Sequence, residues 1–594
     1  MNQETKQCNK CKEAFVIEPE DFQFYEKMQV PPPTWCPECR LIRRLVWRNE
    51  STLYKRPCNA PGHTEDVISM FSADKSIVVY DQKYWWSDAW DRLAQAGQDY
   101  DFSKPFFEQF RKLLRSAPMP ALSTGYPTMV RSEYSNWAGD LKNCYLIVDA
   151  DFVEDSAYGS GIIHCKDSFD IDFTRHSELC YFSFDIEKCY QTVYSVSCKD
   201  CSDVYFSKDC VGCSHCFGCV NLRNKKYHIF NKAYSQEEYE AKIKEFGLGS
   251  YKNLTDLKAR SQELWLKYPK RSYRGLHNTN VKGDYVYHSK NVQYGFLITD
   301  VEDSKYIALI HSKPTKDCYD YTDWGDNVQS IYESMSVGLG AEKIRFSHLV
   351  FANAREVEYS YFCTRSSNMF GCVGLKDKQY CILNKQYSKE EYKELREKII
   401  EHMNKMPYVD AAQRVYRYGE FFPPDMSPFG YNETVAYEYF PLTKTEAVDG
   451  KYKWKDAEEK NYQATVRADE LPDTIDAVQD SITKEIIGCE HGGTCNHKCK
   501  TAFRIISQEL QFYKRMNLPL PRLCPSCRHY ERIAYRNPLK LWHRQCMCDY
   551  KVYENTIKHQ HHPDGRCPNE FETSYSNDRK EIVYCEQCYQ AEVI

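Results

Sequence analysis

The sequence predicts a multidomain, mainly β protein: two duplicated segments of parallel β-solenoid, each with a helical extension, flanked by N- and C-terminal treble-clef or zinc-ribbon modules. Three observations carry this prediction: a length of 594 residues, 29 cysteines that fall into three groups, and two internal duplications. At roughly 150 residues per domain, this length allows about four domains. Apolar residues at 42% and charged residues at 27% are ordinary globular values, which excludes a wholly disordered, collagenous or coiled-coil chain.

The two ends of the chain repeat one another. Cysteine, aromatic and proline positions recur at a constant offset of 488 residues, so that Cys11, Phe15, Tyr25, Cys36 and Cys39 match Cys499, Phe503, Tyr513, Cys524 and Cys527. We therefore expect one module in two copies, at residues 1–92 and 476–594.

Paired cysteines predict a metal site in each copy. Four of them, in two CxxC pairs, lie in the N-terminal copy: Cys8, Cys11, Cys36 and Cys39. Four thiolates from two tight turns can surround one Zn²⁺ ion, and the second pair opens a helical run whose N-terminus favours anionic ligands. The C-terminal copy supplies Cys495, Cys499, Cys524 and Cys527, with Cys489 as a rival for the first position.

A second metal set is predicted in the C-terminal module. Its cysteines form a CxC and a CxxC, namely Cys546, Cys548, Cys585 and Cys588, and the alternative ligands are Cys567, His559, His561 and His562. The N-terminal copy has Asp81 and Tyr84 in place of the last pair, so we expect it to have lost this metal. Cys58, His63 and Asp81 remain there as three unlike groups, for which a structural role is favoured. In all, we expect about three structural zinc ions, one N-terminal and two C-terminal, and no small-molecule cofactor.

The central region is duplicated at an offset of 153 residues. FGCVNLRNKKYHIFNKAYSQEEY matches FGCVGLKDKQYCILNKQYSKEEY, and each copy enters a helix with a capping box, Ser235 with Glu238 and Ser388 with Glu391. Upstream of each helix, aromatic residues recur at intervals near 12 in β-rich strings, which predicts stacked coils of a solenoid. We place the solenoid segments at 121–233 and 276–387, a connector at 93–120, a helical spacer at 234–275, and a helix with an extended acidic connector at 388–475.

A string of six cysteines lies in the first solenoid segment: Cys198, Cys201, Cys210, Cys213, Cys216 and Cys219. Their spacing resembles an iron–sulfur or zinc string. Coils of 12 residues would instead stack Cys189, Cys201 and Cys213 in one column of small core side chains. Because the duplicate places Ser366 and Met369 within this string, packing is favoured over metal.

Arginines follow the second cysteine pair in both end modules. Three of them share one helical face in each copy at spacing i, i+4, i+8, and a fourth recurs farther on. Since arginine makes bidentate phosphate contacts, we predict a nucleic-acid-binding role for Arg40, Arg44, Arg48, Arg56, Arg528, Arg532, Arg536 and Arg544. The alternative is a solvated face, or pairing with carboxylates inside the module.

Both end modules resemble a family of uncharacterised bacterial proteins. The resemblance rests on CNKCKEAF and FYEKMQVPPPTWCPECR near the N-terminus, on CNHKCKTAF and FYKRMNLPLPRLCPSCR near the C-terminus, and on the Cys- and Tyr-rich middle. It implies duplicated zinc-ribbon or treble-clef modules and a bacterial origin, with no established activity to transfer.

Binding is the favoured class of function, because every predicted metal site is saturated with thiolates and leaves no open position for water. The first hypothesis is a zinc-stabilised scaffold that contacts RNA or a ribonucleoprotein through the arginine-bearing helices. The alternative is a protein-protein or glycan-binding scaffold that uses the solenoid face. An enzyme comes third, either polysaccharide-active through Asp167, Asp170, Asp172 and Asp185, or a nuclease using His529, His543 and the histidines at 559–562. No catalytic residue is assigned.

The chain is expected to be soluble and cytoplasmic, with no membrane contact. Its first residues, MNQETKQCNKCKE, lack the apolar core of a secretory signal, and it contains no run of 18 apolar residues. The formal charge of −5 excludes a globally basic nucleic-acid binder, although not a local basic patch. Without a secretory signal, the cysteines are predicted to be reduced.

Overall fold

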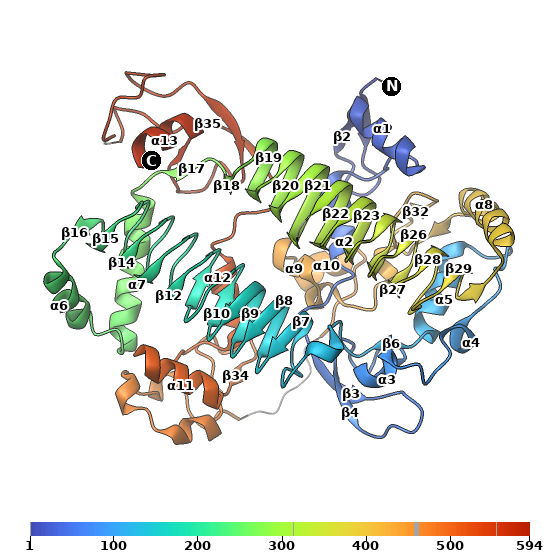
Figure 1. Ribbon diagram of the computed structural model, residues 1–594, viewed down its shortest axis with the longest axis horizontal. Coiled ribbons are helices and arrows are strands. Elements are labelled where there is room, and N and C mark those ends of the chain that lie inside the picture. The colour runs from blue at the N-terminus through green and yellow to red at the C-terminus, as the bar shows by residue number, and fades with distance from the viewer. Residues whose placement is uncertain (1, 313, 457–462, 554) are drawn as a thin grey trace. The chain divides into compact units, whose positions relative to one another are not determined.

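The computed structural model describes residues 2–312, 314–456, 463–553 and 555–594 (Figure 1). The chain divides into two compact units, each made of two separate stretches. Unit 1 contains residues 1–122 and 273–456, and unit 2 contains residues 123–272 and 457–594. The N-terminal module therefore belongs with the second copy of the central duplication, and the C-terminal module belongs with the first. All 29 cysteines are free thiols.

Unit 2 is built around a 10-stranded sheet whose strands follow the order of the chain. All neighbours are parallel except the last pair, and the register advances by 12 residues per strand, as where Tyr181 lies opposite Phe169 and Val193. We call this the first parallel sheet. Its strands are β7 (Asn136–Lys142), β8 (Tyr145–Glu154), β9 (Ala157–Lys166), β10 (Phe169–Asp172), β11 (Tyr181–Phe184), β12 (Tyr190–Val193), β13 (Ser202–Tyr205), β14 (Ser214–Phe217), β15 (Lys226–Ile229) and β16 (Lys232–Ala233).

The backbone of this sheet bends at regular intervals of three residues. Along β8 and into β9, positive φ angles of 50° to 60° recur at Leu146, Asp149, Phe152, Asp155 and Tyr158. Residues other than glycine rarely adopt this left-handed backbone conformation, and aspartate is among the residues that tolerate it best. Four such bends fit one 12-residue repeat, which accounts for the period of the aromatic residues and for the frequency of aspartate at the bends.

The cysteine string lies in the interior of the first parallel sheet. Cys189, Cys201 and Cys213 are each at most 3% exposed. They follow one another at the 12-residue step, as predicted, and each thiol donates to the carbonyl oxygen two residues earlier, at 3.1 to 3.4 Å. These contacts are compatible with the predicted packing of small core side chains.

Unit 1 contains a 13-stranded sheet, the second parallel sheet, whose strands stack in a row in Figure 1. Here the register step varies: Lys290 lies opposite Thr279, Thr315 opposite Val301, and Ser367 opposite Arg355. The strands are β18 (Gly275–Leu276), β19 (Thr279–Tyr287), β20 (Lys290–Thr299), β21 (Val301–Ser312), β22 (Thr315–Gly325), β23 (Val328–Gly338), β24 (Glu342–Arg345), β25 (His348–Phe351), β26 (Arg355–Glu358), β27 (Tyr361–Thr364), β28 (Ser367–Phe370), β29 (Gln379–Ile382) and β30 (Lys385–Gln386).

Helices follow both copies of the central duplication, and both predicted capping boxes are confirmed. The Ser235 hydroxyl accepts from the Glu238 N–H at 3.2 Å and the Ser388 hydroxyl from the Glu391 N–H at 3.3 Å, while each glutamate accepts from the serine N–H at 2.9 Å. These contacts satisfy amides that the first turn leaves unpaired. The helices are α6 (Gln236–Phe246), α7 (Tyr251–Leu266) and α8 (Lys389–Lys405).

The N-terminal module occupies the first part of unit 1. The module and the connector after it form β1 (Glu4–Gln7), β2 (Ala14–Ile17), α1 (Pro19–Met28), α2 (Pro37–Leu45), β3 (Tyr54–Pro57), β4 (Asp66–Ser69), β5 (Val79–Tyr80), α3 (Gln82–Trp86), α4 (Arg92–Ala96), α5 (Phe106–Ser116) and β6 (Met119–Pro120). The short 3₁₀ helix at Tyr126–Thr128 lies in unit 2. The predicted connector at 93–120 thus contains a helix, α5, whose apolar side is buried.

The C-terminal module repeats this order in unit 2. Its elements are β33 (Ile487–Gly488), β34 (Ala502–Phe503), α11 (Ser507–Met516), α12 (Pro525–Ile533), β35 (Trp542–Gln545), β36 (Glu570–Thr573), β37 (Val583–Tyr584) and α13 (Glu586–Val593), and β37 pairs with β17 (Lys270–Arg271). Three 3₁₀ turns precede it, at Ala468–Glu470, Ile475–Ala477 and Asp480–Lys484.

The segment after α8 differs from the extended acidic connector that the sequence predicts. It forms β31 (Tyr408–Val409), β32 (Val415–Tyr416), α9 (Val435–Tyr439), α10 (Lys444–Asp449) and 3₁₀ turns at Pro424–Met426 and Tyr431–Glu433. Phe422 is fully buried and lies 5.0 Å from Trp47 and 4.9 Å from Phe110, measured between ring centroids. Aromatic burial therefore fixes this stretch within unit 1. The acidic run at 457–460 lies outside the described residues.

No helix among the described residues has the length and apolar character needed to cross a bilayer.

Candidate metal centres

The N-terminal centre brings together the four predicted cysteines, Cys8, Cys11, Cys36 and Cys39, with all four sulfur atoms within 4.8 Å of one another. Cys8 follows strand β1 directly, and Cys36 is the N-cap of helix α2. The Cys36 N–H donates to Cys8 Sγ at 3.2 Å, and the Cys11 and Cys36 sulfurs lie 3.7 Å apart. Around a tetrahedral zinc ion with bonds of about 2.3 Å, sulfur atoms lie about 3.8 Å apart. The site therefore has the shape of a closed four-thiolate metal centre.

The first C-terminal centre has the same construction but one different ligand. The set is Cys489, Cys499, Cys524 and Cys527. Cys489 follows β33 as Cys8 follows β1, and it accepts from the Cys524 N–H at 3.3 Å. The residues that follow these two cysteines also make equivalent backbone hydrogen bonds. The Glu490 N–H donates to the Arg522 carbonyl oxygen, and the Asn9 N–H donates to the Thr34 carbonyl oxygen.

Cys489, rather than the predicted Cys495, thus takes the position of Cys8. The alignment by offset failed because the loop between the first two ligands is longer in this copy. The added loop carries His491, Cys495 and His497, which form a further candidate set with Cys527. The Cys495 and Cys527 sulfurs lie 3.6 Å apart.

The second C-terminal centre also exchanges one predicted ligand. Its four buried cysteines are Cys546, Cys567, Cys585 and Cys588. Cys567 therefore replaces the predicted Cys548; its sulfur lies 3.9 Å from that of Cys585, and the Cys546 sulfur lies 3.7 Å from that of Cys588. Cys548 turns instead toward His559, whose Nδ1 lies 3.5 Å from its sulfur, and it forms another set with His559, His562 and Cys588. The HQHH run therefore lies among candidate metal ligands.

The N-terminal copy has the same backbone arrangement at the equivalent position, with different side chains. Asp81 is the N-cap of α3 as Cys585 is of α13, and its N–H donates to Cys58 Sγ at 3.3 Å, as that of Cys585 does to Cys546 Sγ at 3.1 Å. The Asp81 carboxylate lies 3.7 Å from Cys58 Sγ and 2.9 Å from His63 Nδ1. This agrees with the predicted alignment of Asp81 on Cys585.

The arginines of helix α2 are buried against carboxylates of the second parallel sheet. The helix packs on β22 and β23. Arg40 Nη2 lies 2.8 Å from Asp320 Oδ2, and Arg44 Nη1 lies 3.4 Å from the other oxygen of the same carboxylate. Arg43, on the same helix, pairs with Glu333 at 2.6 Å. Arg48 pairs with Asp323 and donates to Ser336 Oγ at 3.1 Å.

Helix α12 repeats this arrangement on the first parallel sheet, where it packs on β10 and β11. Arg532 Nη1 lies 2.6 Å from Asp170 Oδ1, and its Nε lies 2.6 Å from Asp172 Oδ2. Arg528 lies between Asp170, at 3.3 Å, and Glu509, at 3.0 Å. All three carboxylates are completely buried, so each ion pair excludes water.

The predicted role of these arginines as an exposed phosphate-binding row is therefore wrong for the buried ones. Arg40, Arg44, Arg48, Arg528 and Arg532 are at most 1% exposed. Arg56 is 5% and Arg544 9% exposed, and their guanidinium groups donate to the carbonyl oxygens of Ser72 and Ser576, at 3.4 and 3.0 Å. Arg536 is half-buried. The sequence alternative, pairing with carboxylates, describes the helix arginines. Asp170, Asp172, Asp320 and Glu333 belong to the sheets, whereas Glu509 lies on helix α11 of the module itself.

The residues considered for an enzymatic role form ion pairs and hydrogen bonds with other parts of the fold. Asp170 and Asp172 pair with Arg532, and Asp185 accepts from the Ser197 hydroxyl at 2.7 Å. His529 lies 3.2 Å from Asp172, within the same ion-pair network, and His543 lies on the surface between Glu570 and Glu572.

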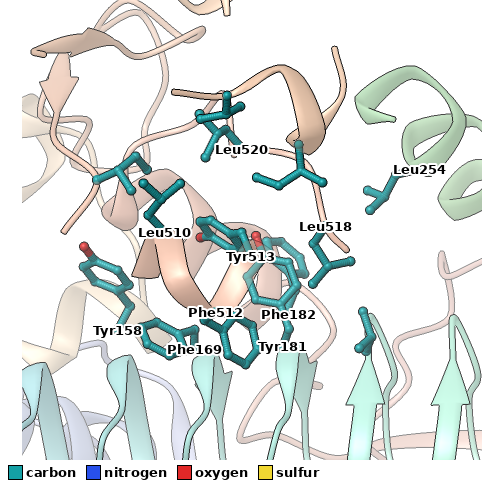
Figure 2. Packing of buried hydrophobic residues seen from close by; sticks show 14 of the residues in the cluster. Tyr158, Phe169, Tyr181, Phe182, Leu254, Leu510, Phe512, Tyr513, Leu518 and Leu520 are labelled. Atoms are coloured by element: carbon teal, nitrogen blue, oxygen red, sulfur yellow. The ribbon is translucent and has the colours of Figure 1, made fainter. Parts of the chain in front are cut away.

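The helix α11 completes the docking of the C-terminal module. Figure 2 shows Phe512 and Tyr513 of α11 packed on Phe169 and Tyr181 of the first parallel sheet. Ring centroids lie 4.6 Å apart for Phe169 and Phe512 and 5.4 Å apart for Tyr181 and Tyr513. The cluster also includes Cys524 and Cys527, so metal ligands and sheet share one buried core.

Charge pairing changes the acidity of the buried carboxylates. Burial alone would raise the pKa of Asp172, but the Arg532 guanidinium and His529 outweigh it and hold this pKa below its usual value of 3.8. Burial raises the pKa of Glu333 despite the attraction of Arg43 and Arg44. The Asp172 pair therefore stabilises the fold in its charged form.

We expect the Asp172→Asn substitution to destabilise the protein in a pH-dependent manner. A carboxylate with a lowered pKa in the folded state adds stability above its unfolded pKa and loses it as pH falls through its folded pKa. The difference in unfolding free energy from the wild type, about 2 kcal/mol at neutral pH, should shrink below about pH 4. Urea denaturation between pH 3 and 7 measures it, with Asp167→Asn, at a partly exposed carboxylate, as control. A difference that stays constant with pH would contradict the assignment.

Comparisons with known proteins give no family for this chain. No family model matches it, and no curated protein matches it. One solved structure from Desulfovibrio desulfuricans G20, described as a "putative acetyltransferase", aligns at 9% identity over 47% of this chain and 83% of its own, with a TM-score of 0.08. A likeness this weak says nothing about the fold or function of the present protein.

Proposed function

We propose that this protein is a zinc-stabilised binding scaffold in which each parallel sheet is a β-solenoid, held by a treble-clef module, and offers its uncovered face to a protein partner. One observation carries the proposal. In both units, a helix opened by two candidate metal-ligating cysteines inserts arginines into buried carboxylates of the sheet. Metal, helix and sheet then act as one structural element, which suits a rigid support.

Zinc is the metal that the ligand sets favour. Four thiolates at tetrahedral spacing suit Zn²⁺ or iron–sulfur clusters, and a separate closed site at a helix N-terminus is typical of structural zinc. The free state of all 29 cysteines fits a reducing compartment, and we place the protein in the cytoplasm on this ground.

The uncovered part of the first parallel sheet supports a protein partner over a nucleic acid or a glycan. A groove of about 510 Å³ is lined by Lys142, Glu154, Lys166, Phe152 and His164 among others, so both signs of charge are present. Phe152 and His164 stack at 4.7 Å, as do His164 and His176 at 4.8 Å. Because the rings cover one another's faces, a ligand meets mostly ring edges, whereas bases and sugars need open ring faces. A mixed-charge rim with an aromatic centre is typical of protein interfaces.

Site-specific photo-crosslinking tests the proposal. A crosslinking residue at position 152, which is 51% exposed, should trap one defined protein in cells, whereas one at the exposed Val552 of the same unit should not. The purified partner should then bind the Phe152→Ala variant about 30-fold more weakly than the wild type. Conversely, RNA binding that falls steeply with salt, and that Arg536→Ala abolishes, would support the nucleic-acid hypothesis instead.

A further inference from the structure

We infer that the C-terminal module holds a binuclear metal centre in which the Cys588 thiolate bridges two divalent ions of the zinc type. The sequence predicts two ions in this module; this inference adds one more, bound by residues that no CxxC motif marks. It goes beyond the scaffold function and does not depend on any partner.

Two complete ligand sets meet at Cys588. One contains Cys546, Cys567 and Cys585, and the other contains Cys548, His559 and His562; in each set, with Cys588 included, the ligand atoms lie within 4.8 Å of one another. Apart from Cys588, the sets share no residue. Six further ligands around one sulfur exceed the four that a single tetrahedral zinc ion accepts.

The position of Cys588 between the sets follows from its contacts. Its sulfur lies 3.7 Å from Cys546 Sγ of the first set and 3.1 Å from His562 Nε2 of the second. Tetrahedral coordination with ordinary zinc bonds places two sulfurs about 3.8 Å apart and a sulfur and a nitrogen about 3.5 Å apart. A thiolate has lone pairs to spare for two metals, so this sulfur can complete both tetrahedra.

The second set is oriented as metal ligands are in proteins. His559 Nδ1 lies 3.5 Å from Cys548 Sγ and 3.1 Å from His562 Nε2, and its other nitrogen, Nε2, lies 2.9 Å from Glu592 Oε1. A carboxylate that accepts from the distal nitrogen of a metal-binding histidine fixes its tautomer and aims the free nitrogen at the metal. The Glu592 side chain is only 5% exposed, so this contact is part of the core.

The Cys548 sulfur is supported in the same way. Asn555 Nδ2 donates to it at 3.2 Å, and the Asn555 oxygen accepts from the Tyr584 hydroxyl at 2.8 Å. The donor therefore faces the sulfur in a fixed orientation, which suits a thiolate.

Charge balance also favours a second ion when all five cysteines bind metal as thiolates. All seven ligands are buried, and five of them are cysteines. One divalent ion would leave five thiolates with three uncompensated negative charges in a buried site. Two ions leave one excess negative charge, which the neighbouring hydrogen-bond donors can offset.

Metal analysis of the full-length protein tests the number of ions. The zinc-loaded wild type is dialysed against metal-free buffer and compared with the His559→Gln/His562→Gln variant. We expect the variant to lose one ion per chain, since its four-cysteine set is intact. The His543→Gln variant, at an exposed histidine of the same module, should retain the wild-type content. An unchanged content in the double variant would overturn the inference.

Cadmium-113 NMR of the wild type tests the bridge without any substitution. Two ions that share one thiolate should give two resonances that are scalar-coupled to each other, and both should change in the Cys588→Ser variant. In the double histidine variant, one resonance of the pair should disappear and the other should lose its splitting. Two uncoupled resonances would overturn the shared thiolate. A failure of the partner-binding experiment would leave these results unaffected.

Discussion

Replacing Arg532 with alanine should lower the unfolding free energy of unit 2 by about 3–5 kcal/mol, because it removes a cation shared by two buried carboxylates. Arg532 contacts both Asp170 and Asp172, and its side chain is 1% exposed. Its Nη2 also donates to the Tyr158 carbonyl at 3.1 Å. Removal of the guanidinium therefore takes the shortest partner from two buried carboxylates and from a backbone oxygen, and leaves Asp170 with Arg528, at 3.3 Å, and Asp172 with His529, at 3.2 Å.

Urea denaturation measures this loss, and amide hydrogen exchange locates it, with the fastest new exchange expected in β10 and β11. Arg504→Ala provides the control, because Arg504 is an exposed arginine of the same module, and its replacement should change stability by no more than about 0.5 kcal/mol. Equal effects of the two substitutions would show that the ion pairs do not anchor the helix. The Arg532→Lys variant should recover only part of the loss, since a lysine cannot reach two carboxylates in a forked geometry.

Removal of the metal should have a still larger effect, and it should be confined to the end modules at first. Binding of structural zinc is worth about 10–16 kcal/mol in small zinc-finger domains, which exceeds the stability of most domains. In the N-terminal module, Cys36 caps helix α2 and Cys39 lies in its first turn, so loss of the ion frees the start of the helix that carries Arg40. The ion pairs between the arginines of α2 and the carboxylates of the second parallel sheet should then break.

Hydrogen exchange before and after chelation tests this sequence of events. Amides of residues 4–45 and 487–533 should lose protection from exchange as zinc is withdrawn. Adding zinc back should restore the protection of these amides. The core of the second parallel sheet, around Ile331 and Ile344, is fully buried and contains no metal ligand, so it provides the internal reference. If chelation removes all zinc and protection of α2 and α12 is unchanged, the ions do not support the docked helices.

Several features of the fold were predictable because they depend on neighbouring residues. The capping boxes at Ser235 and Ser388 are signals within four residues, and the structure confirms both. The cysteines that open α2 and α12 were predicted for a similar reason, since each pair needs only a turn at a helix N-terminus. The mainly β character and the 12-residue step also follow from a pattern repeated along the chain.

Ligands on long loops were harder to assign. Cys489 replaced Cys495 because the loop after β33 is longer than its counterpart after β1, and an alignment without gaps pairs the wrong residues. Cys567, from a distant loop, completes the candidate set of Cys546, Cys585 and Cys588, whereas the predicted Cys548 lies in the neighbouring candidate set with His559 and His562. The sequence offered Cys489 as a rival and Cys567 as an alternative ligand, and a gapped comparison that keeps the cysteine directly after the first strand would have favoured Cys489; no comparable signal ranks Cys567 above Cys548.

The sequence by itself therefore determined which residue types gather: thiolates in duplicated modules, arginines on short helices, and small side chains in a 12-residue repeat. The tertiary structure decided what the arginines do. Arg532 and Asp172 are 360 positions apart, and nothing local to either residue indicates the other. An exposed arginine row and a buried one share the same spacing, and only the docking of α12 on β10 and β11, which excludes water from both charges, distinguishes a phosphate-binding surface from a structural anchor.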